Sequence, residues 1–248
     1  MRPWTEPWRA AVLVHGAGGG GWEWVVWARV LEAAGLEVLA PDLQPGVAGL
    51  AATTLDDYAG QVGDWLRAVP RPRLLVGASL GGLLAMMQAG QADALVLVNP
   101  LPPEGLPGEG RDAADGCVPW GRRASLAGTR QALPDAAPAT LAWAWRRWRD
   151  ESAQVLAQAR AGRAVARPAC PVLVIASEGD DEVPAAASAA LAARWGADLL
   201  RVPGSHVGPL LGRQAAGIAA QAVDWMNADR RTGPEGGRVQ GGLQAGGG

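Results

Sequence analysis

The chain has 248 residues, of which 49% are hydrophobic, so it is long enough to fold around a substantial core. Its formal net charge of −2 comes with no polybasic stretch, which excludes the basic face that nucleic acid needs and an electrostatic membrane anchor. We therefore expect neither nucleic acid nor a membrane surface as a partner.

The first apolar run, residues 10–14, is too short for the core of a signal peptide and too short to span a bilayer. A cytoplasmic protein without a membrane span is the default expectation. Cys117 and Cys170 lie far apart and show no metal-ligand spacing. We expect reduced, partly buried thiols and no metal site.

Short apolar runs bounded by turn residues alternate with longer segments of helical periodicity along most of the chain. This alternation is typical of a mostly parallel sheet with helices on both faces. Because crossovers are right-handed, the loops that follow the strands gather at one edge of the sheet. The expected strands are 11–15, 37–41, 73–78, 94–99, 171–176 and 198–202, and the expected helices are 24–34, 55–69, 80–89, 185–195 and 213–227, with Thr53 or Thr54 capping the second.

The alternation breaks between residues 101 and 169, here called the cap segment. A structureless loop of that length is improbable in a compact domain, so we expect a helical cap inserted into a core made of residues 1–100 and 170–229. The glycine-rich tail, 230–248, lacks periodicity and is expected to be disordered. One helical face is predicted in the cap segment from the spacing of Leu141, Trp145, Trp148, Ser152, Val155 and Ala159.

Residues 77–81, here called the serine turn, read Gly-Ala-Ser-Leu-Gly and fall where an expected strand ends and an expected helix begins. In this context G-x-S-x-G is the pattern of an exposed nucleophilic serine, whose tight turn needs small flanking residues. A helix N-terminus also favours negative charge beside Ser79. The alternative is that the glycines and the serine only form a loop.

A serine hydroxyl needs a base to be a useful nucleophile near neutral pH, and the chain has 2 histidines. His206 follows the last expected strand at the edge of the serine turn and is the candidate base. His15 follows the first strand and is expected to hold its own loop by hydrogen bonding. The acidic run of residues 178–182 follows the strand before His206 and supplies several candidate carboxylates.

The serine turn, the "HGAGGGGW" loop that begins at His15, the "VIASEGDDEVP" loop and "PGSH" together resemble the α/β-hydrolase family over about residues 8–228. The resemblance implies an α/β-hydrolase fold with a triad in the order serine, acid, histidine. The family's acid commonly stands four residues before the proline of a Val-Pro pair, which here selects Asp180. Because Ser177 replaces the usual glycine at the start of that loop, Asp181 stays open as the alternative acid.

The resemblance also implies an oxyanion hole formed by the backbone N–H groups of Ala17 and Leu80. With Ser79, His206 and Asp180 as a triad, the implied reaction is acyl transfer to serine followed by hydrolysis, with no cofactor and no metal. The serine nucleophile argues against relatives that use aspartate there, such as haloalkane dehalogenases and epoxide hydrolases. The absence of lysine argues against plant-type hydroxynitrile lyases, which use a lysine beside the triad.

The expected substrate is a small-molecule ester with an apolar acyl chain of short to medium length. The 12 tryptophans offer broad apolar walls for such a chain. The alternatives that stay open are a thioesterase acting on acyl carriers, a lyase or C–C bond hydrolase using the same triad, and a non-catalytic ligand-binding homologue. The candidate acyl-pocket residues are Trp22, Trp143 and Trp145, with Trp24, Trp27, Trp120 and Trp148 as further candidates near the same loops.

Overall fold

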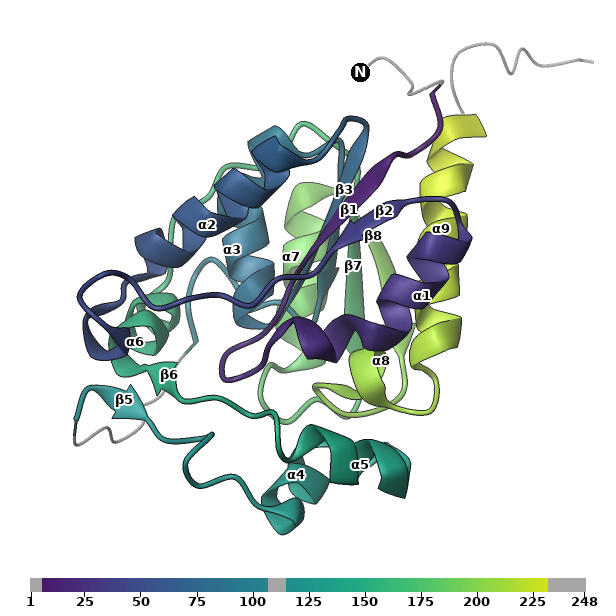
Figure 1. Cartoon of the computed structure of the whole chain (residues 1–248). Helices are drawn as coiled ribbons and strands as arrows, with labels where there is room; N and C mark the ends of the chain where they lie inside the picture. Colours follow the sequence, from purple (N-terminus) through teal and green to yellow (C-terminus); the bar gives the residue numbers. More distant parts are fainter. Residues whose placement is uncertain (1–5, 107–114, 232–248) are drawn as a thin grey trace, which may run out of the picture.

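A six-stranded parallel sheet forms the centre of the computed structural model, which describes residues 6–106 and 115–231 (Figure 1). The order β2-β1-β3-β4-β7-β8 places the serine turn, which follows β3, near the middle of the sheet. The strands are β1 Ala10–Val14, β2 Glu37–Leu39, β3 Arg73–Ala78, β4 Ala94–Val98, β7 Val172–Ser177 and β8 Asp198–Val202.

All six expected strands are confirmed, with ends that differ by at most two residues. The inner strands are continuous apolar runs because both faces of a parallel sheet are covered by helices. Along β1, alternate side chains enter different cores: Val12 and Val14 pack on one face of the sheet and Ala11 and Leu13 on the other. The loops after β1, β3, β7 and β8 leave the same edge.

Helices cover both faces of the sheet, as expected. The helices α2, α3 and α7 pack on one face, and α1 and α9 pack on the other (Figure 1). The N-cap of α2 is Thr54, which forms a capping box with Asp57. The helices are α1 Val25–Ala33, α2 Leu55–Ala68, α3 Leu80–Gln88, α4 Leu126–Ala132, α5 Pro138–Ala144, α6 Ala153–Ala161, α7 Ala185–Trp195, α8 Gly208–Leu211 and α9 Ala215–Arg231, with short 3-10 turns at Gly21–Trp24, Leu50–Ala52 and Ala89–Gln91.

The cap segment contains α4, α5, α6 and a small antiparallel pair formed by β5 (Cys117–Val118) and β6 (Glu151–Ser152). The single helical face predicted across Leu141 to Ala159 is wrong, because α5 ends at Ala144 and α6 begins at Ala153. The chain turns at residues 145–147, and tertiary contacts hold the residues that follow, up to α6, out of a helix. The N–H of Arg149 donates to the Gly18 carbonyl, and Ser152 caps α6 while its hydroxyl donates to the Thr53 carbonyl.

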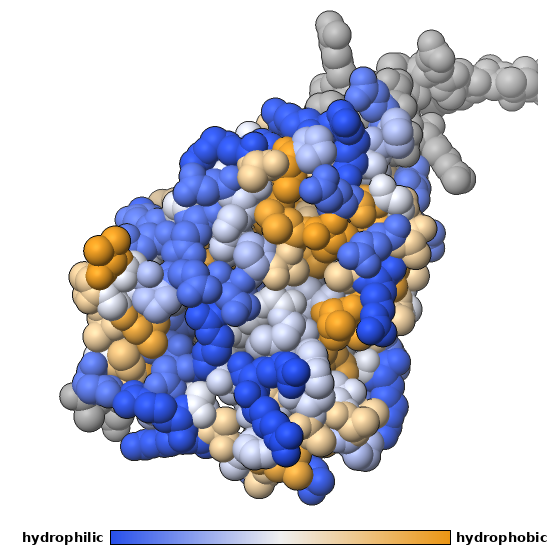
Figure 2. Space-filling view, viewed as in Figure 1, coloured by the Kyte–Doolittle hydropathy of each residue, from blue (hydrophilic) through white to orange (hydrophobic). Residues whose placement is uncertain are grey.

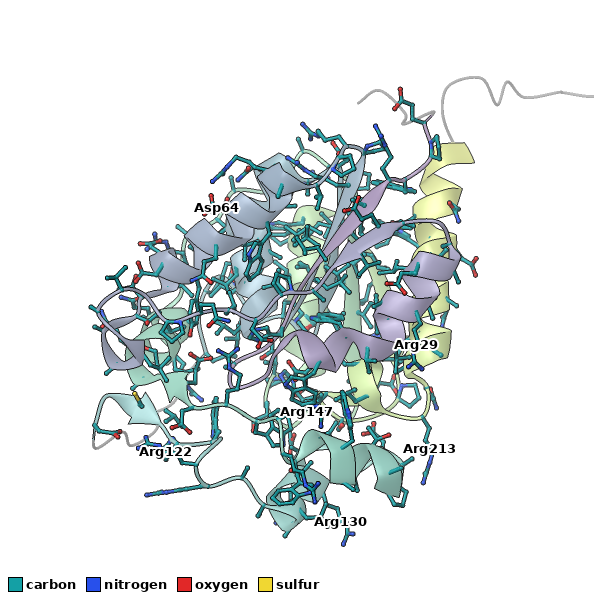
Figure 3. All side chains as sticks on the ribbon, in the orientation of Figure 1. Arg29, Asp64, Arg122, Arg130, Arg147 and Arg213 are labelled. Carbon is teal, nitrogen blue, oxygen red and sulfur yellow. The ribbon has the colours of Figure 1, made fainter. Side chains whose placement is uncertain are left out.

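Polar residues cover most of the visible surface, and apolar side chains gather there in separate patches (Figure 2). Figure 3 shows Arg122 and Arg130 of the cap segment pointing away from the sheet. No helix within residues 6–106 and 115–231 is both long enough and apolar enough to cross a bilayer. The tail 230–248 was expected to be disordered, but Arg230 and Arg231 continue α9, and the rest lies outside the described residues from position 232 onward.

Candidate active site

Ser79 stands in the left-handed region at the turn between β3 and α3, with φ 53° and ψ −119°. A non-glycine residue rarely adopts such a φ, and strain of this kind is concentrated at functional sites. The neighbouring glycines are required by close backbone approach. A Cβ on Gly77 would lie 2.2 Å from the Gly81 carbonyl oxygen, and a Cβ on Gly81 would lie 2.2 Å from the Val14 carbonyl oxygen. The serine turn therefore depends on residues that carry no side chain.

His206 pairs with Asp180. The Nδ1 atom of His206 lies 2.7 Å from Oδ2 of Asp180, and the Asp180 side chain is fully buried. The other carboxylate oxygen of Asp180 accepts the N–H groups of Glu182 and Val183 at 2.9 and 2.8 Å. A carboxylate held in this way fixes the imidazole orientation and stabilises a proton on Nδ1. Of the two candidate acids, the structure brings Asp180 against His206, whereas Asp181 lines the cavity described below.

Asn99 joins the ends of two strands to the loop that carries His206, and the sequence analysis missed it. Its φ of 44° is the second positive value at a described non-glycine residue. Its amide nitrogen donates to Oγ of Ser177 at 2.9 Å and to the His206 carbonyl at 2.7 Å, while its Oδ1 accepts the Ser177 N–H at 2.8 Å. The Ser177 hydroxyl is therefore a buried acceptor, and Asp180, three residues further on, contacts His206. The Asn-Pro pair directly after an apolar run was the available signal.

The loop after β1, His15–Gly20, is here called the glycine loop, and two buried carboxyl groups hold it. The Gly16 N–H donates to Oε2 of Glu23 at 3.3 Å, and the Gly18 N–H donates to Oε2 of Glu151 at 3.1 Å. Among the described residues no acceptor faces the intervening N–H of Ala17. The same holds for the Leu80 N–H, the first amide of α3, which has no intrahelical partner.

His15 binds the backbone through both ring nitrogens. Nδ1 lies 2.8 Å from the Gly16 carbonyl oxygen, and Nε2 lies 2.8 Å from the Leu43 N–H. The second bond requires an unprotonated Nε2, so the proton resides on Nδ1. Burial lowers the pKa of His15 to about 4 despite the favourable bond to Gly16. His15 is therefore neutral and holds the glycine loop by hydrogen bonding, as expected from the sequence.

Glu23 is a buried carboxyl group that lines the cavity, and the sequence analysis missed it. Burial raises its pKa to about 8, although the Gly16 and Gly20 amides act in the opposite direction. At neutral pH the group is therefore mostly protonated. A neutral carboxyl beside the glycine loop adds no negative charge near the Ala17 N–H. The signal in the sequence was an acidic residue between two tryptophans in an otherwise apolar stretch.

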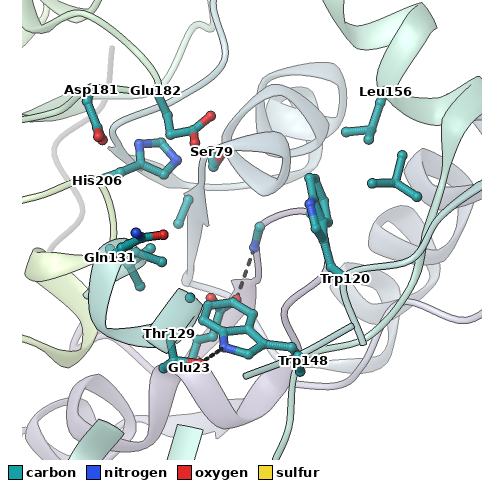
Figure 4. Close-up of a pocket in the computed structure, with 18 of the residues that line it drawn as sticks. Glu23, Ser79, Trp120, Thr129, Gln131, Trp148, Leu156, Asp181, Glu182 and His206 are labelled. Carbon is teal, nitrogen blue, oxygen red and sulfur yellow. Dashed lines mark hydrogen bonds between the residues drawn. The ribbon is translucent and has the colours of Figure 1, made fainter. Parts of the chain in front are cut away.

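A cavity of about 1030 Å³ contains Ser79 and His206 at one end and Glu23 at the other (Figure 4). Most of its remaining lining comes from the cap segment, including Trp120 and Trp148. In Figure 4 the Trp120 indole stands across from His206, and the Trp148 indole is drawn beside Thr129 at the Glu23 end. Trp148 is fixed by a hydrogen bond from Nε1 to Oγ1 of Thr129 at 2.9 Å. The cavity is therefore roofed by residues far from Ser79 in the sequence.

The three tryptophans selected for the acyl pocket lie outside this lining. Trp22 and Trp143 contact each other edge to face at 5.5 Å between centroids, and Trp22 also contacts Trp148 at 5.1 Å, so they support the wall from behind. Trp145 is the C-cap residue of α5 and lies beneath the Arg146 guanidinium. The other two candidates, Trp24 and Trp27, are fully buried in the core. The spacing of tryptophans in the sequence could not distinguish those that line the cavity from those that pack behind its wall, because both kinds occupy apolar positions.

The side chains of Ser79 and His206 line the same cavity, but within the described chain they are not hydrogen bonded to each other. Catalytic hydrogen bonds are often loose before substrate binds. The described residues contain no cluster of three or more histidine, cysteine, aspartate or glutamate side chains that could hold a metal ion. The site therefore offers a hydroxyl, an imidazole paired with a carboxylate, and two unpaired backbone N–H groups.

The model of the alpha/beta hydrolase family matches residues 11–221. Similar crystal structures include a pyrethroid hydrolase from Sphingobium faniae JZ-2 (TM-score 0.66, 22% identity, covering 89% of this chain and 98% of that one). They also include the methylesterase MES16 from Arabidopsis (TM-score 0.68, 18% identity, covering 88% of this chain and 99% of that one). A third is a variant of tomato methylketone synthase I complexed with β-ketoheptanoate (TM-score 0.69, 16% identity, covering 90% of this chain and 99% of that one). At these identities the likeness shows the fold. A comparison with curated proteins gave no match.

Proposed function

Because the chain belongs to the α/β-hydrolase family, we propose that it is a serine hydrolase that cleaves carboxylic esters through an acyl-enzyme on Ser79. The observation that carries this proposal is the meeting of Ser79 and the His206–Asp180 pair at one cavity. The strained turn at Ser79 supports it as well, because a positive φ at a non-glycine residue is costly and such strain is concentrated at functional sites.

In the proposed reaction, Nε2 of His206 takes the proton of the Ser79 hydroxyl while Oγ forms a bond to the ester carbonyl carbon. Asp180 holds the Nδ1 proton and stabilises the imidazolium. The carbonyl oxygen becomes an oxyanion that accepts the N–H groups of Ala17 and Leu80, each contributing a factor of about 10²–10³. The imidazolium then gives its proton to the departing alcohol. Water, activated by the same base, hydrolyses the acyl-enzyme.

The cavity supports a small-molecule ester with an apolar acyl chain of short to medium length. Its volume of about 1030 Å³ is at the upper end of ordinary ligand sites, which is ample for such a substrate. Trp120, Trp148 and Leu156 give it apolar walls (Figure 4). Structures of this fold named as a pyrethroid hydrolase, a methylesterase and polyneuridine aldehyde esterase agree with ester chemistry.

The nucleophile is tested by treating the protein with a fluorophosphonate and mapping the adduct by mass spectrometry. We expect one adduct, on the peptide that contains Ser79, and none in Ser79→Ala. The matched control is Ser188→Ala, which removes a buried hydroxyl on α7 that has no partner in the described part of the chain. Labelling elsewhere, or full activity in Ser79→Ala, contradicts the proposal.

The substrate class is tested with p-nitrophenyl esters from acetate to palmitate, beside the matching acyl-CoA thioesters. We expect the highest kcat/KM at short to medium acyl length and on the oxygen ester. Activity on palmitate alone would rule out the proposed acyl preference. Thioester turnover that far exceeds ester turnover would favour a thioesterase. Labelled Ser79 without any ester turnover would favour a lyase or C–C bond hydrolase.

A further inference from the structure

Glu151 of the cap segment reaches into the body of the molecule, where three donors converge on its carboxylate. Oε2 accepts the Gly18 N–H at 3.1 Å, and Oε1 accepts the Tyr58 hydroxyl at 2.9 Å and the Ser152 N–H at 2.8 Å. The side chain is buried, with the residue 3% exposed. A buried carboxylate is costly unless it is well bonded, so these contacts fix its position.

Gly18 is held by the cap segment on its other side too. Its carbonyl accepts the Arg149 N–H at 2.8 Å. Its φ is +67°, and a Cβ there would lie 2.5 Å from the Trp120 ring and 3.2 Å from the Arg149 carbonyl oxygen. The residue next to Ala17 is therefore enclosed by cap residues, which leaves the glycine loop little freedom while the cap segment is in place.

Asp135, between α4 and α5, makes the corresponding contact with the loop that carries His206. Its Oδ2 accepts the Ser205 N–H at 3.0 Å, and its Oδ1 accepts the Ser205 hydroxyl at 2.8 Å. A Cβ on Gly204 or Gly208 would lie 2.5 or 2.2 Å from the same Oδ2. The carboxylate thus sits in a hollow left by two glycines and holds the residue directly before His206.

We propose that the cap segment positions the catalytic groups through these two carboxylates: Glu151 fixes the glycine loop and its Ala17 N–H, and Asp135 fixes the His206 loop. This inference rests on the proposed function. Glu151 and Asp135 lie in different parts of the cap segment. Glu151 contacts Gly18, which is next to Ala17, and Asp135 contacts Ser205, which is next to His206. The glycine loop and the His206 loop therefore reach their active positions only when the cap segment packs against them. The cap segment then has a second role besides enclosing the substrate.

The test compares Glu151→Gln and Asp135→Asn with Asp150→Asn. In Glu151→Gln one carboxylate oxygen is replaced by an amide NH2 group, so only one oxygen remains to accept the three hydrogen bonds. Asp150 is the matched control, because its side chain is an acidic neighbour of Glu151 that bonds Arg122 within the cap segment. The measurements are kcat and KM on the best p-nitrophenyl ester, the thermal midpoint, and the inhibition constant of a trifluoromethyl ketone, which forms an oxyanion on a reactive serine.

We expect Glu151→Gln to lower kcat about 10- to 100-fold and to weaken the ketone by a similar factor, with KM changed less than about threefold. For Asp135→Asn we expect a loss of about tenfold in kcat. If Glu151→Gln does not fold, Tyr58→Phe removes one of its bonds and should give a smaller loss of the same kind. Unchanged kcat and ketone binding, or an equal loss in Asp150→Asn, would overturn the inference. A wild-type protein that no fluorophosphonate labels would instead overturn the proposed function.

Discussion

His15 and His206 follow two strands of the same parallel sheet, at the same edge, yet their second ring nitrogens meet different partners. Nε2 of His15 accepts a backbone N–H, whereas His206 is bonded through Nδ1 to Asp180 and its remaining nitrogen is on the side of the cavity that contains Ser79. Both nitrogens of His15 are bonded to the backbone, whereas only Nδ1 of His206 is bonded within the described residues. This difference is the reason why we propose His206, and not His15, as the base.

The largest effect is expected when His206 loses the ring nitrogen Nε2. In His206→Gln we expect kcat/KM for esters to fall by about 10⁴-fold or more, because Ser79 loses its base. The thermal midpoint should fall as well, since the side chain is 13% exposed and its loss leaves the buried Asp180 carboxylate without its partner, so the rates are compared well below the midpoint of each protein. Steady-state kinetics with a fluorescence melting curve provide the measurement. If His206→Gln retains a tenth of the activity, His206 is not the base and the two histidines do not differ in the way proposed.

The second prediction concerns the acid. Asp180→Asn keeps the shape but loses the charge that stabilises the imidazolium, so we expect kcat to fall by about 10²- to 10⁴-fold. Asp181→Asn on the same loop should cost less than about tenfold, because its carboxylate does not contact His206. Equal and mild losses in the two variants would show that neither carboxylate serves the histidine.

The third prediction addresses His15. His15→Gln leaves the Leu43 N–H or the Gly16 carbonyl unpaired, so we expect a loss of about 1–3 kcal/mol in the free energy of unfolding. In the wild type the unfolded chain binds a proton near pH 6.5 and the folded chain only near pH 4. Stability should therefore fall as pH drops through that window, and His15→Gln should lack this contribution. Urea unfolding at pH 7 and pH 4.5 measures both effects, and an identical pH dependence in the variant would contradict it.

The smallest effect on activity near neutral pH is expected from Glu23, whose folded pKa is raised from 4.5 to about 8. The folded chain keeps its proton between these values and the unfolded chain does not, so this contribution to stability falls as pH rises from 4.5 to 8. The stability of Glu23→Gln should not fall in this pH range. Above pH 8 its kcat/KM should fall less than that of the wild type, because an ionised Glu23 in the wild type would oppose the oxyanion. Melting curves and rates at pH 5, 7 and 9 test this. Parallel profiles for the two proteins would show that Glu23 is not protonated near neutral pH.

The body of the fold was predictable because its inner strands are buried on both faces and therefore read as unbroken apolar runs. The serine turn was predictable for a related reason: Gly77 and Gly81 approach other backbone atoms so closely that no side chain fits. The cap segment was predicted less well. A helical pattern through Trp148 and Ser152 was overridden by bonds to the Gly18 and Thr53 carbonyls, which are remote in the sequence.

The sequence alone determined the parallel sheet, the place of Ser79 at a strand-to-helix turn and the edge that gathers the candidate residues, because these depend on local periodicity and on the handedness of crossovers. Tertiary structure decided that Asp180 rather than Asp181 contacts His206, that Trp120 and Trp148 line the cavity, and that Glu23, Glu151 and Asp135 hold its loops. These outcomes depend on distances that local periodicity does not set. The contact between Asp180 and His206 forms where β7 and β8 end side by side, whereas the places of Trp120, Trp148, Glu151 and Asp135 are set when the cap segment packs against the sheet edge.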